Sequence, residues 1–335
     1  MLTLISAQQG LGAGGKIDPA LVPSIFAPES VPAHSISNLA FLVLAITAAI
    51  FVVVAGLLVY AVIRFRCRAD DDGMEPAQIY GSGPVEAAWT TVPFLIVAVL
   101  TLSTARVIQE IQDAHEPAAA VDVQVIGHQW WWEIRYPKLG IVTANELHVP
   151  VSQGARRLPT FLDLRSADVV HSFWVPRLAG KTDLIPNKVN SMWIEPERTG
   201  LFLGQCAKYC GTQHAKMLLR VYVDTPEEFD RWVSQQQKPA SEDSTEAAGR
   251  LVFQRTACIN CHAIRGTVAD GRFGPDLTHL MSRDTLGSGA LDNSPQDLRA
   301  WINSPNQFKP GALMPAMNLN AADLDQLVAY LTTLR

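Results

Sequence analysis

The sequence predicts a membrane-anchored chain of several domains: a two-helix transmembrane hairpin, a β-sandwich or Greek-key barrel, and a small all-α domain. Two long uncharged segments lie in the first third of its 335 residues. Short segments of alternating polarity fill the middle, and helical periodicity returns toward the C-terminus. A chain of this length has room for roughly two or three domains.

The two uncharged segments predict the hairpin. The first, from Asn38 to Ile63, exceeds the ~20 residues that a helix needs to cross the hydrocarbon core. The second, from Ala87 to Ala105, is close to the minimum length and contains Pro93. Such a residue is tolerated where a partner helix satisfies the freed backbone groups. We therefore expect the hairpin, residues 38–117, to contact membrane lipid and another subunit.

Basic residues set the expected orientation. Arg64, Arg66 and Arg68 follow the first segment directly, so the loop between the helices should be cytoplasmic. Residues 1–37, rich in Gly, Pro and Ala, then form an irregular outer segment. The rest of the chain faces the periplasmic side of a bacterial plasma (inner) membrane, where thiols need not stay reduced. The net charge of −5 and the lack of a basic stripe argue against nucleic acid as a partner.

Residues 118–234 carry the strand signal. Short runs punctuated by Gly and Pro favour a β-sandwich or barrel, closed by a short helix at Glu227–Ser234. A polar linker is expected over residues 235–246. The predicted strands are Val121–Ile126, Trp130–Tyr136, Glu146–Val149, Arg157–Leu164, Val189–Ile194 and Leu218–Val223.

Soft metal ligands gather at one point of this middle region: Cys206, Cys210, His214 and Met217, with His171 upstream. Two thiolates can bridge two copper ions, with one imidazole on each and a thioether on one; thiolate and thioether ligands select copper. A zinc site of two Cys and two His is an alternative, as is a Cys206–Cys210 disulfide. The nearby Met favours copper over zinc, and a disulfide would leave the His and Met without a purpose.

The C-terminal region, residues 247–335, holds a second motif. Cys258-Ile-Asn-Cys261-His262 is the covalent attachment signature of a c-type haem, with His262 as the proximal ligand. A helix at 247–257 precedes it, and an amphipathic helix follows Asn320, a plausible cap. This is the layout of a cytochrome c. A methionine is expected as the distal ligand if the reduction potential of the haem is high. The candidates are Met281, Met314 and Met317.

With both motifs in view, the chain resembles subunit II of haem-copper cytochrome c oxidases, over about residues 37–223. Its C-terminal part is similar to the cytochrome c fused to this subunit in some bacteria. The segment before Met314 resembles the usual axial-Met loop, so we select Met314, with Met317 as the fallback. The matching stretches are Gly127–Trp130, Ser166–Pro176, Lys181–Pro186 and Cys206–Met217.

The resemblance implies a cupredoxin fold and a dinuclear CuA centre. Its ligands would be the side chains named above together with the backbone carbonyl of Lys208. The family usually has Glu at this position, and that carboxylate also helps to hold a magnesium or manganese ion beside subunit I. An ammonium group has no lone pair to offer. We expect this chain to give that ion no side-chain ligand.

Two further roles come from the resemblance. The tryptophan that matches Trp130 lies between the external haem and the copper, and so would mediate electron transfer. Because successive side chains on a strand alternate, Trp130, Trp131 and Trp132 cannot all face the core. Glu86, at the start of the second helix, is either an interfacial end-cap or the cytoplasmic mouth of a proton channel into subunit I.

The expected function is that of the subunit through which a proton-pumping terminal oxidase receives electrons. A reduced donor, such as a cytochrome or a respiratory complex, would reduce covalent haem c. Electrons would pass to CuA and on to subunit I, where oxygen is reduced to water. The matching subunit of a nitric oxide reductase that uses CuA is the alternative, and a membrane-anchored carrier without a catalytic partner is another.

Overall fold

The computed structural model describes residues 21–66, 78–112, 120–152, 159–240 and 247–335. It separates into two compact units. One is His34–Ala114, and the other is formed by the remaining residues.

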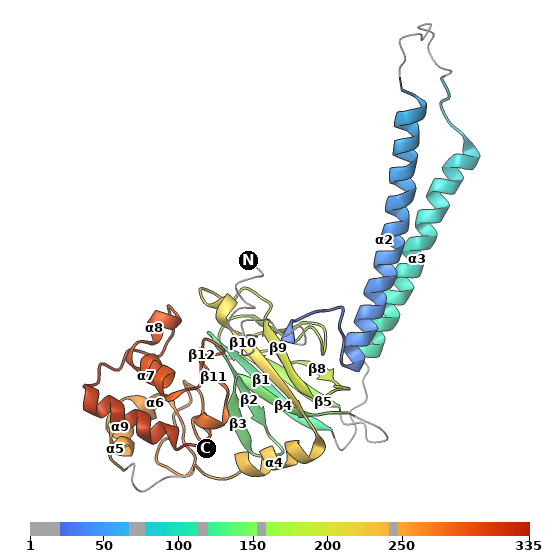
Figure 1. Cartoon of the computed structure of the whole chain (residues 1–335). Coiled ribbons are helices and arrows are strands. Elements are labelled where there is room, and N and C mark those ends of the chain that lie inside the picture. The colour runs from blue at the N-terminus through green and yellow to red at the C-terminus, as the bar shows by residue number, and fades with distance from the viewer. Residues whose placement is uncertain (1–20, 67–77, 113–119, 153–158, 241–246) are drawn as a thin grey trace. The chain divides into compact units, whose positions relative to one another are not determined.

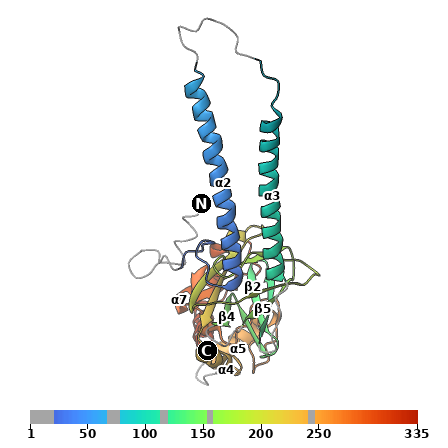
Figure 2. The same ribbon diagram turned by 90° about the vertical axis from the view of Figure 1, so that its right-hand side faces the viewer.

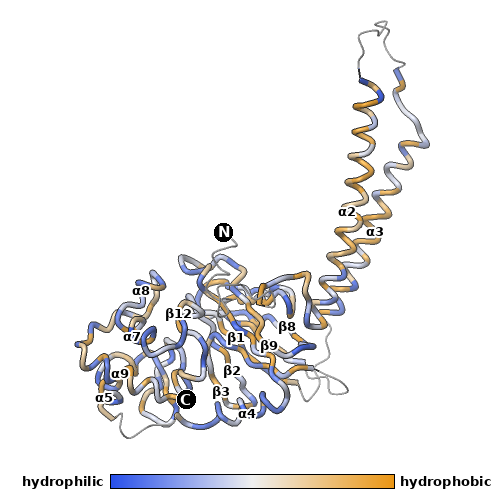
Figure 3. Tube along the Cα trace, viewed as in Figure 1, coloured by the Kyte–Doolittle hydropathy of each residue, from blue (hydrophilic) through white to orange (hydrophobic). Residues whose placement is uncertain are grey.

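The first unit is a helical hairpin of α2 (Val31–Arg64) and α3 (Gly83–Gln112), which lie side by side (Figure 2). Both helices are long and apolar enough to cross a membrane. Apolar residues run along both helices (Figure 3), and many of their large side chains are exposed. The Ser35 hydroxyl near the start of α2 donates to the Glu110 carboxylate near the end of α3, at 3.2 Å. The predicted antiparallel hairpin is thereby confirmed.

The helices extend beyond the uncharged segments. α2 begins at Val31, before the predicted boundary at residue 38, and α3 ends at Gln112. Residues 113–117 of the predicted hairpin lie outside the described residues. The difference arises because hydropathy marks only the part of a helix suited to lipid, whereas backbone hydrogen bonding continues into polar flanks.

The second unit contains a β-sandwich (Figure 1). One sheet has the order β3-β2-β1-β5-β8, and the other has the order β4-β10-β9-β6-β7. The first consists of β1 (Val121–His128), β2 (Trp131–Tyr136), β3 (Ile141–Ala144), β5 (Thr160–Ser166) and β8 (Asn190–Ile194). The second consists of β4 (Glu146–Pro150), β6 (His171–Trp174), β7 (Thr182–Leu184), β9 (Gly200–Cys206) and β10 (Leu218–Asp224).

The core lies between the two sheets. Val123 and Val125 of β1 and Ile134 of β2 join Leu147 of β4 and Val221 of β10 in one buried cluster. In β1 the buried side chains alternate with partly exposed ones, as the period-two sequence pattern predicts. Each fully buried side chain of this size contributes about 1.5–3 kcal/mol of stabilisation. The sandwich therefore gives the metal-ligand loops a rigid support.

α4 (Pro226–Gln236) closes the sandwich. Thr225 caps it: the Glu228 N–H donates to the threonine hydroxyl, and the Glu228 carboxylate accepts from the Thr225 N–H. The predicted linker, 235–246, begins too early, because Gln235 and Gln236 belong to α4. Gln236 is buried and donates to the Ser282 hydroxyl at 3.1 Å. A polar composition concealed this helical end, and residues 241–246 lie outside the described part of the chain.

The C-terminal part is a small, mainly helical domain. α5 packs across α9, and the fit needs Gly249, because a Cβ there would lie 2.0 Å from the Gln326 carbonyl oxygen. Asn320 caps α9, as predicted. The elements of this C-terminal domain are α5 (Ala247–Arg255), α6 (Cys258–Cys261), η4 (Leu280–Ser282), β11 (Thr285–Leu286), β12 (Leu291–Asp292), α7 (Pro295–Asn303), α8 (Pro305–Phe308) and α9 (Ala321–Thr332).

The short β11–β12 hairpin is an addition to the all-α prediction, and it contacts the sandwich. The buried Glu146 carboxylate accepts hydrogen bonds from the backbone N–H groups of Asp284 (2.9 Å) and Thr285 (3.0 Å). The Leu218 N–H donates to the Ser288 carbonyl at 3.2 Å, and the Ser288 hydroxyl donates to the Leu218 carbonyl at 2.7 Å. The hairpin thus joins the helical domain to the end of the sandwich that carries Leu218.

Candidate metal centre and haem pocket

The sheet topology brings the upstream histidine to the cysteine loop. β6 and β9 are antiparallel neighbours, with Phe173 paired to Cys206. His171 is the first residue of β6, and Cys206 is the last residue of β9. The two side chains therefore meet at one end of the sandwich, where β6 begins and β9 ends, although they are far apart in the sequence.

All the predicted ligand atoms converge there. The Cys206 and Cys210 sulfurs are 3.8 Å apart. The Cys206 sulfur lies 3.9 Å from His171 Nδ1. The Cys210 sulfur lies 3.6 Å from His214 Nδ1 and 3.9 Å from the Met217 sulfur. Each cysteine sulfur thus lies beside a different histidine, His171 for Cys206 and His214 for Cys210. The two sulfurs lie together between these histidines.

Lys208 contributes its backbone rather than its side chain. Its carbonyl oxygen lies 3.2 Å from the Cys206 sulfur. Its ammonium group forms an ion pair with Asp183 at 3.7 Å. The side chain is thus engaged by a carboxylate outside the ligand cluster.

Asp168 orients the upstream histidine. Its carboxylate lies 2.8 Å from His171 Nε2, and it also accepts from the N–H groups of Val169 and Gln129, both at 2.6 Å. Burial alone lowers the pKa of His171, but the Asp168 hydrogen bond and the Cys206 sulfur outweigh it, so the pKa is raised. With Nε2 held by Asp168, Nδ1 is the nitrogen left for a metal. The site also needs Gly127, since a Cβ there would lie 2.8 Å from the imidazole.

The donor set fits a pair of copper ions. Two thiol sulfurs, one thioether, two imidazole nitrogens and one carbonyl oxygen face a common, mostly buried space. In the described part of the chain both cysteines are free thiols, so the disulfide alternative is not the arrangement seen here. A zinc site of two Cys and two His would leave the thioether and the carbonyl unused, whereas soft sulfur ligands favour copper.

The three consecutive tryptophans do not all face the core, as predicted: β2 begins at Trp131, and strand alternation separates Trp131 from Trp132. Trp132 is fully buried, whereas Trp130 and Trp131 are partly exposed. The Trp130 indole N–H donates to the Cys210 carbonyl at 3.0 Å, and the Gln129 amide donates to the same oxygen at 2.7 Å. Trp130 is therefore tied directly to a predicted copper ligand.

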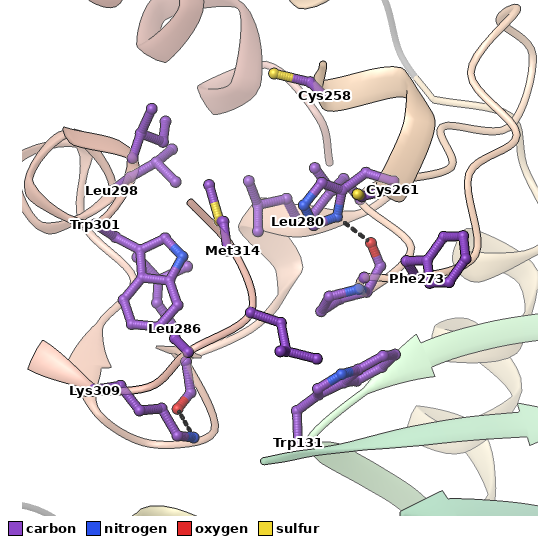
Figure 4. Close-up of a pocket in the computed structure, with 18 of the residues that line it drawn as sticks. Trp131, Cys258, Cys261, Phe273, Leu280, Leu286, Leu298, Trp301, Lys309 and Met314 are labelled. Carbon is purple, nitrogen blue, oxygen red and sulfur yellow. Dashed lines mark hydrogen bonds between the residues drawn. The ribbon is translucent and has the colours of Figure 1, made fainter. Parts of the chain in front are cut away.

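A largely apolar cavity of about 360 Å³ lies next to the cysteine motif of the helical domain. Trp131 reaches it from the start of β2 (Figure 4), and Trp130 is also part of its wall. The cavity thus lies between the haem-attachment motif and the copper-side tryptophans. The residues around it include Cys258, Cys261, His262, Leu277, Leu280, Leu286, Leu298, Trp301, Met314 and Met317.

The cavity fits a haem in its chemistry. His262 Nδ1 donates to the Pro275 carbonyl at 2.8 Å, which leaves Nε2 free as an iron ligand. Burial lowers the pKa of His262, so the imidazole is held neutral, as a ligand must be. A Cβ at Gly274 would lie 2.6 Å from the imidazole, so this glycine allows the backbone to pack against the ring.

The cavity narrows the choice of distal ligand. Met314 and Met317 both line it, and Met314 lies among its side chains in Figure 4. Met281 packs against the helical core, and among the described residues it is not part of the cavity wall. The cavity therefore agrees with the choice of Met314 and with Met317 as the fallback.

Comparison with known proteins identifies the family of this chain. Family models described as the transmembrane and periplasmic domains of cytochrome c oxidase subunit II match residues 25–107 and 141–223, and one for cytochrome c matches 246–335. Cytochrome c oxidase subunit 2 of Alkalihalophilus pseudofirmus is 31% identical over 315 residues, 92% of this chain and 90% of the relative. This chain belongs to the cytochrome c oxidase subunit 2 family.

Other relatives in the family are similar. Cytochrome c oxidase subunit 2 of Bacillus sp. strain PS3 is 31% identical over 291 residues, 81% of this chain and 80% of the relative. The solved periplasmic domain of subunit II of cytochrome oxidase from Bradyrhizobium japonicum is 30% identical, with a TM-score of 0.34. The match covers 36% of this chain and 96% of that one.

Membership of the cytochrome c oxidase subunit 2 family, with a fused cytochrome c domain, makes the chain part of the oxidase complex and implies CuA and haem c as cofactors. The remaining predicted site residue, Glu86, lies in the first turn of α3 and is exposed. Its carboxylate accepts from the Ser82 N–H at 3.2 Å, as an end-cap does.

Sequence reasoning missed Asp168 and Lys309. Asp168 lies three residues before His171, within a stretch that was already recognised, so a search for an acidic partner of the histidine would have found it. Lys309 had no such signal. It comes close to Trp130 only because the helical domain docks on the sandwich.

Proposed function

We propose that this cytochrome c oxidase subunit 2 receives electrons from a reduced donor at covalent haem c and passes them, through CuA, to subunit I of a proton-pumping oxidase that reduces oxygen. The observation that most directly supports this electron route is the position of Trp130 and Trp131. They form part of the wall of the cavity beside Cys258, Cys261 and His262, and Trp130 donates to the Cys210 carbonyl. The two cofactor sites are therefore joined by two adjacent residues.

On the copper side we propose His171, Cys206, Cys210, His214, Met217 and the Lys208 carbonyl as ligands. These residues would hold copper, which would supply one-electron transfer chemistry at this site. The protein holds the donors on two neighbouring strands and on a loop in which Cys210 and Met217 are buried, so they have little freedom to rearrange. On the haem side we propose thioether bonds to Cys258 and Cys261, with His262 and Met314 as axial ligands.

The membrane hairpin supports the rest of the assignment. Two apolar helices fit an anchor in the bacterial plasma membrane, and the arginines after α2 favour a cytoplasmic turn. Both metal domains would then face the periplasm, where a soluble or membrane-bound donor can reach the haem. The exposed apolar surface of α3 and its Pro93 fit a contact with subunit I.

The decisive experiment is purification of the chain from its native membrane in mild detergent. We expect a large polytopic subunit with two further haems to co-purify, and the sample to consume oxygen with a reduced donor. Optical and EPR spectra of that sample should contain haem c and a mixed-valence copper pair. A chain that purifies alone with both cofactors would instead be a membrane-anchored carrier. Nitric oxide consumption without oxygen consumption would assign it to a nitric oxide reductase.

Lys208 leads to a prediction about a neighbouring metal. We propose that this chain gives the magnesium or manganese ion beside subunit I no side-chain ligand, because its ammonium group pairs with Asp183. Lys208→Glu should restore a carboxylate ligand and raise manganese occupancy in the assembled complex, measured by Mn²⁺ EPR after growth with manganese. Copper content should stay the same, since the copper ligand is main chain. A wild-type density map with a carboxylate of this chain on that ion would contradict the proposal.

Glu86 is proposed as the cytoplasmic mouth of a proton channel. Glu86→Gln keeps the size of the side chain and an acceptor for the Ser82 N–H, but removes the ionisable group. We expect slower turnover and slower proton uptake in vesicles, by roughly 10²-fold, because the group would no longer relay protons. Unchanged uptake would leave Glu86 as an end-cap only.

A further inference from the structure

Lys309 is a buried cation that the proposed cofactor sites do not use. It is 3% exposed, and among the described residues the groups that shift its pKa include no carboxylate. Its ammonium group donates instead to the Trp130 carbonyl at 2.6 Å and to the Gly287 carbonyl at 2.8 Å. Burial lowers its pKa to about 7. Burying an ammonium group costs free energy, which the two carbonyl partners only partly offset. The burial of Lys309 therefore calls for an explanation.

The two carbonyls belong to different parts of the molecule. Trp130 lies in the sandwich, just before β2, and Gly287 lies in the turn between β11 and β12. Lys309 itself follows α8, in the loop that leads to Met314. One side chain therefore ties together Trp130, the β11–β12 hairpin and the loop that carries the proposed distal ligand.

The same loop contacts the copper region at several points. The Gln213 amide donates to the Pro310 carbonyl at 2.7 Å, and the Lys216 ammonium donates to the Phe308 carbonyl at 2.8 Å. Gly311 has a φ of +87°, and a Cβ there would lie 3.5 Å from the Trp130 ring. The loop 308–311 therefore packs closely on Trp130 and on the copper loop.

The docking of the domain as a whole rests on other contacts. Glu146 binds the N–H groups of Asp284 and Thr285, Ser288 exchanges hydrogen bonds with Leu218, and the Arg265 guanidinium donates to the Gly140 carbonyl at 3.0 Å. These anchors do not involve Lys309. Removing the ammonium group should therefore loosen the loop on Trp130 without detaching the helical domain.

We propose that Lys309 is a positioning residue for electron transfer from haem to copper: its ammonium group fixes the loop before Met314 against Trp130. This inference rests on the proposed function. The residue does not itself carry the electron. It sets the contact between the haem side and the indole, whose N–H is already bonded to the Cys210 carbonyl.

The test compares Lys309→Met with Lys188→Met in the full chain. Methionine keeps the apolar stem but leaves both carbonyls without a donor. The control removes the same charge from an exposed lysine in the sandwich. Because unpaired buried carbonyls disfavour the positioned loop, the haem-to-copper rate after photoreduction should fall by roughly tenfold. The haem potential and the copper EPR spectrum should stay as in wild type.

A second measurement does not depend on activity. Amide hydrogen exchange of residues 305–313 should accelerate in Lys309→Met, while exchange of α9 stays unchanged. Lys309→Gln keeps an N–H donor. Its electron-transfer rate and its hydrogen-exchange rate should therefore lie between those of wild type and Lys309→Met. Should Lys309→Met not fold, Lys309→Gln alone must show a slower transfer rate and faster local exchange.

The outcomes separate the two levels of proposal. Wild-type protein that transfers no electron from haem to copper would overturn the proposed function itself. Wild-type transfer with an unchanged rate in the Lys309 variants would overturn the positioning role alone, whether or not local exchange accelerates. A slower rate together with a shifted haem potential would also overturn it, because the axial ligation would then have changed.

Discussion

Replacement of Cys206 by serine is expected to abolish the mixed-valence copper signal and reduce oxygen consumption of the complex to background. The Cys206 sulfur is adjacent to the Cys210 sulfur, His171 and the Lys208 carbonyl, so its loss affects both halves of the pair. The neighbouring Cys210 thiol lowers the pKa of Cys206, which makes it the thiolate of the pair near neutral pH. A serine hydroxyl is a harder and far less acidic ligand.

Metal analysis and EPR of the purified complex check this result. A matched control is Ser191→Ala, a change at a position of β8 outside the ligand cluster that removes one exposed hydroxyl. It should leave copper content and oxygen consumption as in wild type. Retention of the full copper signal in Cys206→Ser would contradict the assignment, and zinc in the wild-type site would contradict the copper centre altogether.

Replacement of Met314 by leucine is expected to remove the sulfur-to-iron absorption band and lower the haem potential. Axial ligands set haem potentials over a range of roughly 0.8 V, and a thioether lies toward the high end. Leucine fills similar space in the apolar cavity, so the domain should remain folded. A lower haem potential favours onward transfer of the electron to copper, but it makes reduction of the haem by its natural donor less favourable. Oxygen consumption with that donor should fall.

Two parallel variants make the assignment specific. Met317→Leu changes the other methionine of the cavity, and Met281→Leu changes one that packs in the core instead. Both should keep the absorption band. If the band is lost only in Met317→Leu, then Met317 is the distal ligand and the choice of Met314 is wrong.

Predictions based on short motifs could be made from the sequence without knowledge of the fold. Cys206, Cys210, His214 and Met217 lie within one loop, so their spacing alone limits how far apart they can be. The same holds for Cys258, Cys261 and His262. Hydropathy likewise identified both membrane helices, because a run of apolar side chains has few other uses. Their ends were less well predicted, since helical hydrogen bonding outlasts hydrophobicity at Val31 and Gln112.

Long-range geometry was harder to predict. Strands β6 and β9, which bring His171 to Cys206, were not among the predicted strands, so these two residues were linked by their ligand chemistry and by the resemblance, not by a predicted strand pairing. The β11–β12 hairpin has only two residues in each strand, too few for a periodic signal. Its role depends on the N–H groups that it presents to Glu146, which no sequence pattern reveals.

Ligand type, ligand spacing and continuous hydrophobicity are local properties, so the amino-acid sequence was enough to predict the cofactor chemistry and the membrane anchor. The folded chain was needed to show that Glu146 accepts from the Asp284 N–H, that Trp130 and Trp131 border the haem cavity, and that Lys309 joins Trp130 to the loop before Met314. Those contacts join residues far apart in the chain or on different domains. They exist because two sheets and a docked helical domain bury their polar groups together, so each buried carbonyl or carboxylate must find its partner across the interface.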